Sequence, residues 1–308
     1  MQMNEIDSLF LSKDPADVFA FYSKFNNAGD LLAYVRGRTY NKPRIFEKDG
    51  DKDVVAVIPT RDHNGEFAKS FCDIFKGFHI IMAESGNDPY FNYGRNVNVA
   101  IHKAVSYDPK WIIVSNDDMY GIDDPAVLKQ GLLRLDNGKI DNVWISPEPE
   151  HHHCHSIHLV ERKKALGILR KAQGAYQRKA HAVLNKFGVD YTLLYGQFKP
   201  HYSLFLRNVK QFLVTEDFFV ISGKYASSIY NSGHRLYDEA FINNAEDAWL
   251  SLGFGPERSA YLEFKIGSKI NGTFTPSKSN DARGILEMIL FDYKLKEYLH
   301  DHGRLPCQ

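Results

Sequence analysis

From residue 53 onward, short apolar runs alternate with segments in which apolar side chains recur at helical spacing. Three of the runs are rich in β-branched and aromatic residues and end in polar loop signals, as buried strands do: VVAVIPT (54–60), FHIIMAE (78–84) and WIIV (111–114). Helical spacing joins them, first at Phe67, Phe71, Ile74 and Phe75, and then from Gly94 to Ser106. Strand, helix, strand, helix, strand is the pattern of a parallel sheet covered by helices on both faces.

The rest of the chain divides around this core. The pattern predicts a helix at 125–135, a strand within DNVWISPEP (141–149), a helix in AEDAWLSLGF (245–254) and a C-terminal helix from Ile285 to Leu299. Helical patterns also cover 14–26 and 30–36. We therefore expect an N-terminal helical extension (1–50), an α/β domain (51–256) with an insertion at about 151–214, and a C-terminal loop and helix (257–308).

Composition narrows the class of protein. Of 308 residues, 44% are hydrophobic and 25% charged with a net charge of zero, which supports a large core and argues against bulk nucleic-acid binding. Three widely spaced cysteines predict no disulfide framework, and hence a reducing, cytoplasmic location. No segment approaches the roughly 20 apolar residues needed to cross a bilayer, so any membrane contact is expected to be peripheral.

The strand at 111–114 runs directly into Asn116, Asp117 and Asp118. Ligands gather at the carboxyl ends of strands in such sheets, and two crowded carboxylates cost electrostatic energy unless a cation arrives. Oxygen ligands favour Mg²⁺ or Mn²⁺. The alternative is an ordinary turn or helix cap, the role that Asp123-Asp124-Pro125 has just downstream.

Four motifs follow one another in a recognisable order. They are Asn116-Asp117-Asp118, Ser222-Gly223-Lys224, Tyr237-Asp238-Glu239-Ala240-Phe241 and Glu246-Asp247. In this order, over residues 53–150 and 215–256, the chain resembles the family 2 glycosyltransferases and their type A (GT-A) fold. The resemblance implies a Rossmann-like α/β fold with a mixed, mainly parallel sheet flanked by helices, a helical insertion and a helical C-terminus.

The resemblance also implies roles for particular residues. Asp118 would be the principal metal ligand, assisted by Asn116 or Asp117, and Asp247, beside Glu246, would be the general base. The nucleotide would contact three segments: Pro59-Thr60-Arg61-Asp62, Glu84 (base or ribose) and Arg95-Asn96. The implied activity is inverting transfer of a sugar, dependent on Mn²⁺ or Mg²⁺, from a nucleotide sugar such as a UDP- or GDP-sugar to a hydroxyl of a glycan or lipid-linked acceptor.

Some positions depart from the family pattern. Trp249 stands where a further acidic residue is frequent, residues 256–280 contain no histidine to complete the metal site, and Glu84-Ser85-Gly86-Asn87 replaces an Asp-Gly-Ser-type turn. Two other functions stay open: nucleotidyl transfer, and non-catalytic binding of carbohydrate or a membrane surface on the same fold. The sequence contains no GxxxxGK[ST] or GxGxxG motif, which disfavours P-loop and dinucleotide-binding folds.

The insertion has two unusual segments. HHHCHSIH (151–158) offers zinc-ligand types without a standard zinc spacing, and we expect it to line a loop at the edge of the active site. Residues 161–186 carry eight Lys or Arg against one Glu, and 160–187 has helical spacing of apolar residues. Two interpretations remain: a basic helix that meets an anionic membrane or a phosphate-bearing acceptor, and a solvated basic face over a core stripe.

Overall fold

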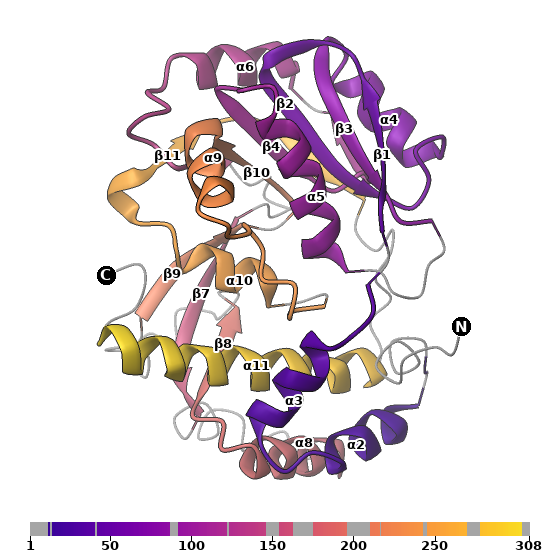
Figure 1. Cartoon of the computed structure of the whole chain (residues 1–308), viewed down its shortest axis with the longest axis vertical. Helices are drawn as coiled ribbons and strands as arrows, with labels where there is room; N and C mark the ends of the chain where they lie inside the picture. The colour runs from indigo at the N-terminus through magenta and orange to yellow at the C-terminus, as the bar shows by residue number, and fades with distance from the viewer. Residues whose placement is uncertain are drawn as a thin grey trace.

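The computed structural model describes residues 12, 14–40, 42–86, 92–121, 123–145, 154–162, 175–195, 210–215, 217–242, 245–269 and 278–303. Its centre is a seven-stranded sheet in the order β1-β3-β2-β4-β10-β6-β11 (Figure 1). The strands are β1 (Arg44–Lys48), β2 (Asp51–Thr60), β3 (Phe78–Glu84), β4 (Trp111–Ser115), β6 (Asn142–Ile145), β10 (Phe218–Ser222) and β11 (Ser259–Leu262).

Most strands of this sheet run in one direction. β2 pairs in parallel with β3 and β4, and β11 pairs in parallel with β6. β1 is antiparallel to β3, and β10 is antiparallel to both of its neighbours. Only β1 and β10 therefore run against the other five, which confirms the expected mixed, mainly parallel α/β sheet at this level of description.

Both faces of the sheet are buried because successive side chains of a strand point to opposite sides. On one face, Val54, Ala56 and Ile58 of β2 pack with α4 (Glu66–Ile74) and α6 (Pro125–Leu133). On the other, Val55 and Val57 pack with α5 (Tyr93–Val105) and α9 (Gly223–Asn231). The unbroken apolar run of β2 is thus the pattern of a strand covered twice, as expected from the sequence.

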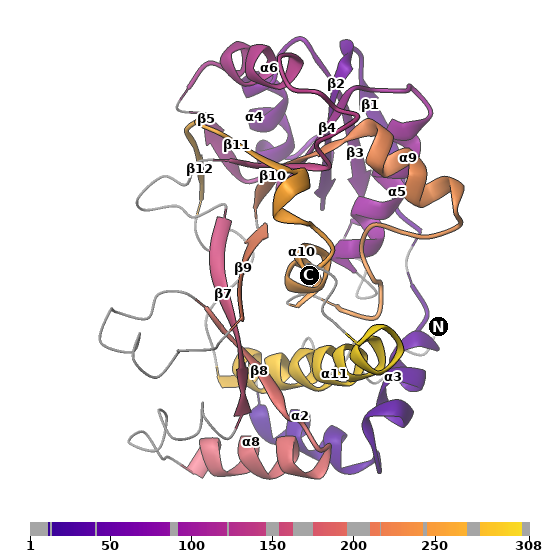
Figure 2. The ribbon, with the colours of Figure 1, turned by 90° about the vertical axis from the view of Figure 1, so that its left-hand side faces the viewer.

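A separate core lies below the sheet. It joins α2 (Pro15–Ser23), α3 (Ala28–Arg36), α8 (Ala175–Lys186), α10 (Glu246–Ser251) and the long α11 (Lys278–His302). Figure 2 shows α10 between the central sheet above and α11 below. Within the described chain, no helix combines the length and apolar character needed to cross a membrane.

Three expectations about the flanking segments need correction. Residues 1–50 are not only helical, because β1 joins the edge of the central sheet. Residues 257–308 contribute β11, and β12 (Ile266–Ser268) pairs with β5 (Met119–Gly121). The insertion is not simply helical: β7 (Cys154–Glu161), β8 (Tyr191–Tyr195) and β9 (Lys210–Thr215) form a second antiparallel sheet.

The two unusual segments of the insertion are described in part. Residues 151–153 and 163–174 lie outside the described residues. The rest of the histidine-rich segment forms the start of β7. Residues 160 and 161 end that strand and are not helical, while α8 forms the described part of the basic helix expected over 160–187. Residues 154–161 form a strand because pairing with β8 and β9 satisfies their backbone hydrogen-bonding groups.

Candidate functional site

The acidic turn follows β4 and is fastened to the residue before β10. The backbone N–H of Asn116 donates to the carbonyl of Asp217 (2.9 Å), and its side-chain amide donates to Oδ1 of Asp217 (3.0 Å). β10 is antiparallel to β4, with Phe218 opposite Ser115, so its first residues lie at the carboxyl end of β4. A third carboxylate, Asp217, is thereby brought to the turn.

Asp117 connects the turn to the end of β2. Its Oδ2 accepts a hydrogen bond of 2.6 Å from the hydroxyl of Thr60. Burial raises the pKa of Asp117, and the hydrogen bond from Thr60 partly offsets that effect. Two of the segments expected to form one site from the sequence, 59–62 and 116–118, are therefore in direct contact.

Asp118 is the buried carboxylate of the turn. Its side chain is only 9% exposed, and its Oδ1 is buried without a hydrogen-bond partner among the described residues. Burial, and then the charges of Asp217 and Asp117, raise the pKa of Asp118 to about 6. An unpaired buried oxygen beside two more carboxylates suits a divalent cation that takes oxygen ligands, so the residues present fit such an ion.

A lysine stands near Asp118. The N–H of Lys269 donates to the carbonyl of Asp118 (2.9 Å), because Lys269 directly follows β12, which pairs with β5. Its ammonium lowers the pKa of Asp118 less than burial and the neighbouring acids raise it. No histidine occurs at 256–280, and this lysine is the positive charge that the segment brings to the turn.

Asp247 lies on the first turn of α10 and is held by a tyrosine. The hydroxyl of the buried Tyr237 donates to Oδ1 of Asp247 at 3.0 Å. Burial and the charge of Asp247 raise the pKa of Tyr237 well above its usual value, so the phenol stays protonated and remains a donor.

Tyr93, the first residue of α5, is affected by the carboxylates of both the acidic turn and the start of α10. Burial raises its pKa well above the usual value, as do the charges of Asp247, Asp217, Glu246 and Asp118 in that order. The charges of the acidic turn and of the start of α10 thus both act on the phenol of Tyr93. Asp118 and Asp247 are 129 positions apart in the sequence, yet both raise the pKa of this one residue.

Glu246 is buried and also neighbours α11. It is 4% exposed, and its charge adds to the effect of burial in raising the pKa of Glu287 well above the usual value. Oε1 of Glu287 accepts a hydrogen bond from the N–H of Ile242 (3.3 Å), while its Oε2 is buried without a partner in the part of the chain described. The hydrogen bond from Ile242 to Glu287 fastens the segment before α10 to the C-terminal helix.

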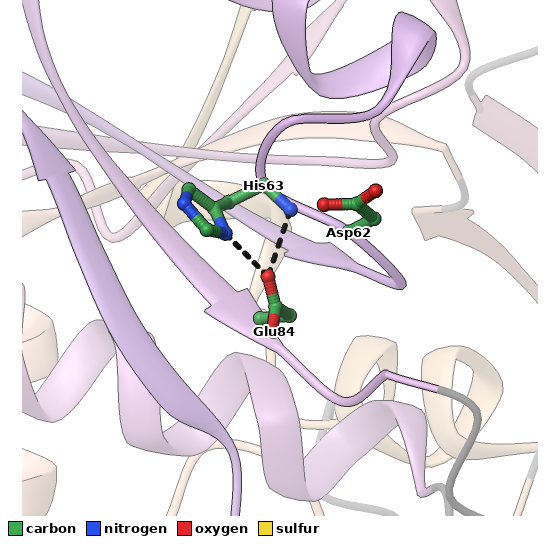
Figure 3. Close-up of side chains that lie close together, drawn as sticks. All are labelled: Asp62, His63 and Glu84. Atoms are coloured by element: carbon green, nitrogen blue, oxygen red, sulfur yellow. Dashed lines mark hydrogen bonds and ion pairs between the residues drawn. The ribbon is translucent and has the colours of Figure 1, made fainter.

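Glu84 is bound to protein cations and donors. It contacts Arg44 of β1 and accepts from the backbone N–H (3.0 Å) and Nδ1 (2.5 Å) of His63 (Figure 3). Burial alone would raise its pKa, but the hydrogen bonds from His63 and Arg44 lower the pKa to about 2. The ring of His63 is itself stacked on Phe46, with centroids 3.5 Å apart.

The same corner has the donor set of a metal centre. Ligand atoms of Asp62, His63 and Glu84 lie within 4.8 Å of one another, the one such group of three among the described residues. Figure 3 shows Glu84 directed at His63, with Asp62 beside them. With Arg44 on Glu84, the cluster already has a positive charge, so a cation there would compete with a guanidinium.

The remaining sequence-predicted residues lie on β2, the loop after it, and α5. Pro59 is buried within β2, and Arg61 is exposed after its end. Arg95 pairs with Glu239 (2.8 Å). Asn96 is fully buried, and neither its amide nitrogen nor its oxygen has a partner within the described residues.

A pocket of about 440 Å³ opens beside Tyr237, between α3, the 234–240 segment and α10. Its lining includes Arg36, Tyr40, Arg235, Tyr237, Asp238 and Trp249. Tyr237 therefore belongs to both the pocket wall and the hydrogen bond that holds Asp247.

No protein-family model matches the chain, and no curated protein matches it significantly. The site is thus defined by its own geometry. Two of its residues carried no assignment from sequence: Asp217, which resembles any acid before a strand, and Tyr93, which resembles an ordinary helix start. The tyrosine of the 237–241 motif, Tyr237, was noted there without a role.

Proposed function

We propose that the chain is a metal-dependent, inverting glycosyltransferase of the GT-A type that moves a sugar from a nucleotide-sugar donor to a hydroxyl of a glycan or lipid-linked acceptor. The observation that carries the proposal is the acidic turn after β4: Oδ1 of Asp118 is buried without a partner among the described residues, and hydrogen bonds from Thr60 and Asn116 hold Asp117 and Asp217. The charges of Asp118 and Asp247 both act on Tyr93. The order of motifs shared with family 2 glycosyltransferases supports it.

Asp118, with Asn116 or Asp117 and the neighbouring Asp217, would hold Mn²⁺ or Mg²⁺. When bound, the cation supplies positive charge for the diphosphate leaving group. The chain prepares this position in advance: Thr60 fixes Asp117 at 2.6 Å, and Asn116 fixes Asp217 at 3.0 Å. Oδ1 of Asp118 stays available, because it is buried without a partner in the described chain.

Asp247 would take the proton from the acceptor hydroxyl. A carboxylate within hydrogen-bonding reach of an alcohol makes it a competent nucleophile, and the hydrogen bond from Tyr237 fixes the orientation of this one. Attack directed by Asp247 from the side opposite the diphosphate inverts the anomeric carbon. Glu246, the neighbour of the base in α10, is buried, and its charge raises the pKa of Glu287 on α11.

The donor nucleotide would lie along 59–62, Glu84 and the start of α5. The side-chain amide nitrogen and oxygen of Asn96 have no partner among the described residues, while Arg95 is paired with Glu239. The carboxylate of Glu84 accepts hydrogen bonds from His63 and contacts Arg44, so its contribution would be to position these two cationic or polar side chains for the nucleotide.

The test is hydrolysis of UDP-, GDP-, CDP- and TDP-sugars with and without Mn²⁺, because transferases commonly release sugar slowly to water. We expect one nucleotide class to be hydrolysed only with metal, and Asp118→Asn to abolish both hydrolysis and metal-dependent nucleotide binding. Asp247→Asn is expected to abolish transfer while nucleotide binding is kept.

Asp73→Asn, an exposed acid on α4, is the matched control for loss of one negative charge. The proposal fails if no nucleotide sugar binds in the presence of Mn²⁺, or if Asp247→Asn transfers sugar at the rate of the unmodified chain.

A further inference from the structure

The pocket beside Tyr237 has more positive charge than its own acids can balance. Its two lining carboxylates are already engaged: Asp238 contacts Lys294 of α11, and Glu239 pairs with Arg95 at 2.8 Å. Arg235 reaches Glu239 only at 3.4 Å and is 55% exposed. Arg36 has no ion-pair partner within the described residues, so the opening carries an unbalanced guanidinium.

An aromatic surface lies next to these cations. Trp249 is partly exposed and lines the pocket. Its ring makes an edge contact with Phe291 (centroids 5.7 Å apart), and the ammonium of Lys294 lies 4.9 Å from its ring centroid. A rigid indole face packs against the apolar C–H face of a sugar ring. Tyr40 also lines the pocket, and its hydroxyl donates to the carbonyl of Glu239 (3.0 Å).

We propose that this pocket binds the acceptor and selects one whose sugar carries an acidic group, a carboxylate or a phosphate. That the bound sugar is an acceptor rests on the proposed function, but its binding to the pocket does not depend on transfer. Arg36 and Arg235 bind the acid, Trp249 covers the sugar ring, and Tyr237 connects the pocket to Asp247. A guanidinium at the mouth matches either anion by paired N–H donors.

Binding of small probes to the full chain in EDTA tests the selection without any donor. The probes are glucose 1-phosphate, glucuronic acid and glucose. Calorimetry and tryptophan fluorescence measure the binding of each. We expect at least one acidic probe to bind at least about 10-fold more tightly than glucose, the effect of about 1.4 kcal/mol from one favourable charged contact. The phosphate and carboxylate arms decide which acid is preferred.

Arg36→Gln and Arg235→Gln, alone and together, should remove that preference, whereas Lys69→Gln on the exposed face of α4 should keep it. Trp249→Phe should weaken all three probes alike and abolish the fluorescence change. Equal binding of glucose and both acidic probes, or an unchanged preference in the double variant with a native melting curve, would overturn the proposal.

Asp118→Asn separates this inference from the proposed function. The variant should bind the acidic probe as the unmodified chain does, because Asp118 does not line the pocket. Retained probe binding in a chain that never uses a nucleotide sugar would leave the pocket assignment standing and reject the transferase. Transfer that shows no preference for acidic acceptors would do the reverse.

Discussion

The hydroxyl of Tyr237 donates a hydrogen bond of 3.0 Å to Oδ1 of Asp247. Tyr237 is itself fixed by α5, because the amide of Asn98 donates to its carbonyl (2.9 Å) and accepts from its N–H (2.9 Å). The orientation of the proposed base is therefore set by a helix more than a hundred residues earlier in the chain. α5 also carries Tyr93, whose pKa is raised by burial and by the charges of both Asp247 and the acidic turn.

Tyr237→Phe tests this orientation. The ring remains to fill its buried position, while the donor to Asp247 is lost. Because a hydrogen bond to a charged group is worth about 1.5 to 3 kcal/mol, we expect kcat for transfer to fall about 10- to 100-fold. The donor KM should be unchanged, because the lost hydroxyl donates to Asp247 and the phenylalanine ring keeps its packing against α5. A larger donor KM with unchanged kcat would assign Tyr237 to donor binding instead.

Gly94→Ala tests the same relationship from the side of α5. A Cβ at Gly94 would lie 2.9 Å from Cβ of Tyr237, which is too close for the backbone of either residue to stay in place. We expect a loss of stability of about 1 to 3 kcal/mol, as overpacking commonly causes, and a fall in kcat from the displaced tyrosine. Thermal melting and steady-state kinetics measure the two effects.

Gly37→Ala is the matched control, since the atoms nearest its Cβ would lie 3.5 Å away at ordinary contact distance. It should leave kcat unchanged. If both variants lower kcat equally, the effect does not act through Tyr237.

The elements that sequence predicts well are those whose pattern is decided locally. β2, β3, β4 and the helices α4 and α5 follow directly from their apolar runs and spacing. In contrast, β5 and β12 are three residues each and pair across more than a hundred positions, so neither has a local signal. For residues 154–161 the sequence pattern predicts a loop and the start of a helix, but pairing with the strands β8 and β9 makes this segment a strand.

The site divides in the same way. The carboxylates at 116–118 and 246–247 can be found because they end or begin predicted elements. Asp217 cannot, because its place beside Asn116 depends on the direction of β10, and nothing in FFVIS indicates whether the strand runs parallel or antiparallel. Glu84 was expected to face the nucleotide, but its pairing with Arg44 depends on β1, a strand that the sequence pattern did not predict.

Asp118→Asn should separate function from stability. The carboxylate is buried near Asp217 and Asp117, and its pKa is raised to about 6, so its ionised form costs the metal-free fold free energy. Removing that charge should stabilise the metal-free chain by up to about 3 kcal/mol at pH 8, at 1.4 kcal/mol per pKa unit. Thermal melting in EDTA measures the gain.

The same variant should lose the increase in melting temperature that Mn²⁺ gives the unmodified chain. Asp73→Asn should show neither change. A lower melting temperature for Asp118→Asn in EDTA would mean that the carboxylate makes a stabilising contact in the metal-free fold, contrary to its unpartnered Oδ1.

Glu287→Gln gives a stability change that depends on pH. Burial, and then the charge of Glu246, hold the pKa of Glu287 well above its usual value of 4.5, so folding favours the protonated form. Stability from this group is fully present below pH 4.5 and is lost as pH rises toward the folded pKa. Glutamine keeps an oxygen to accept the N–H of Ile242 and has no proton to lose.

The stabilisation by Glu287→Gln should therefore be small at pH 4.5 and grow steadily to pH 8. There it should exceed about 1.4 kcal/mol, the value of one pKa unit. Urea unfolding at pH 4.5, 6, 7 and 8 measures this, with the exposed Glu263→Gln as a control for loss of a surface carboxylate. A difference in free energy of unfolding that stays constant with pH would show that Glu287 is ionised in the folded chain, with Arg38 as its counter-charge. In that case an ion pair between Glu287 and Arg38 would fasten α11 to the segment after α3, and Glu287→Gln would destabilise the fold at every pH above 5.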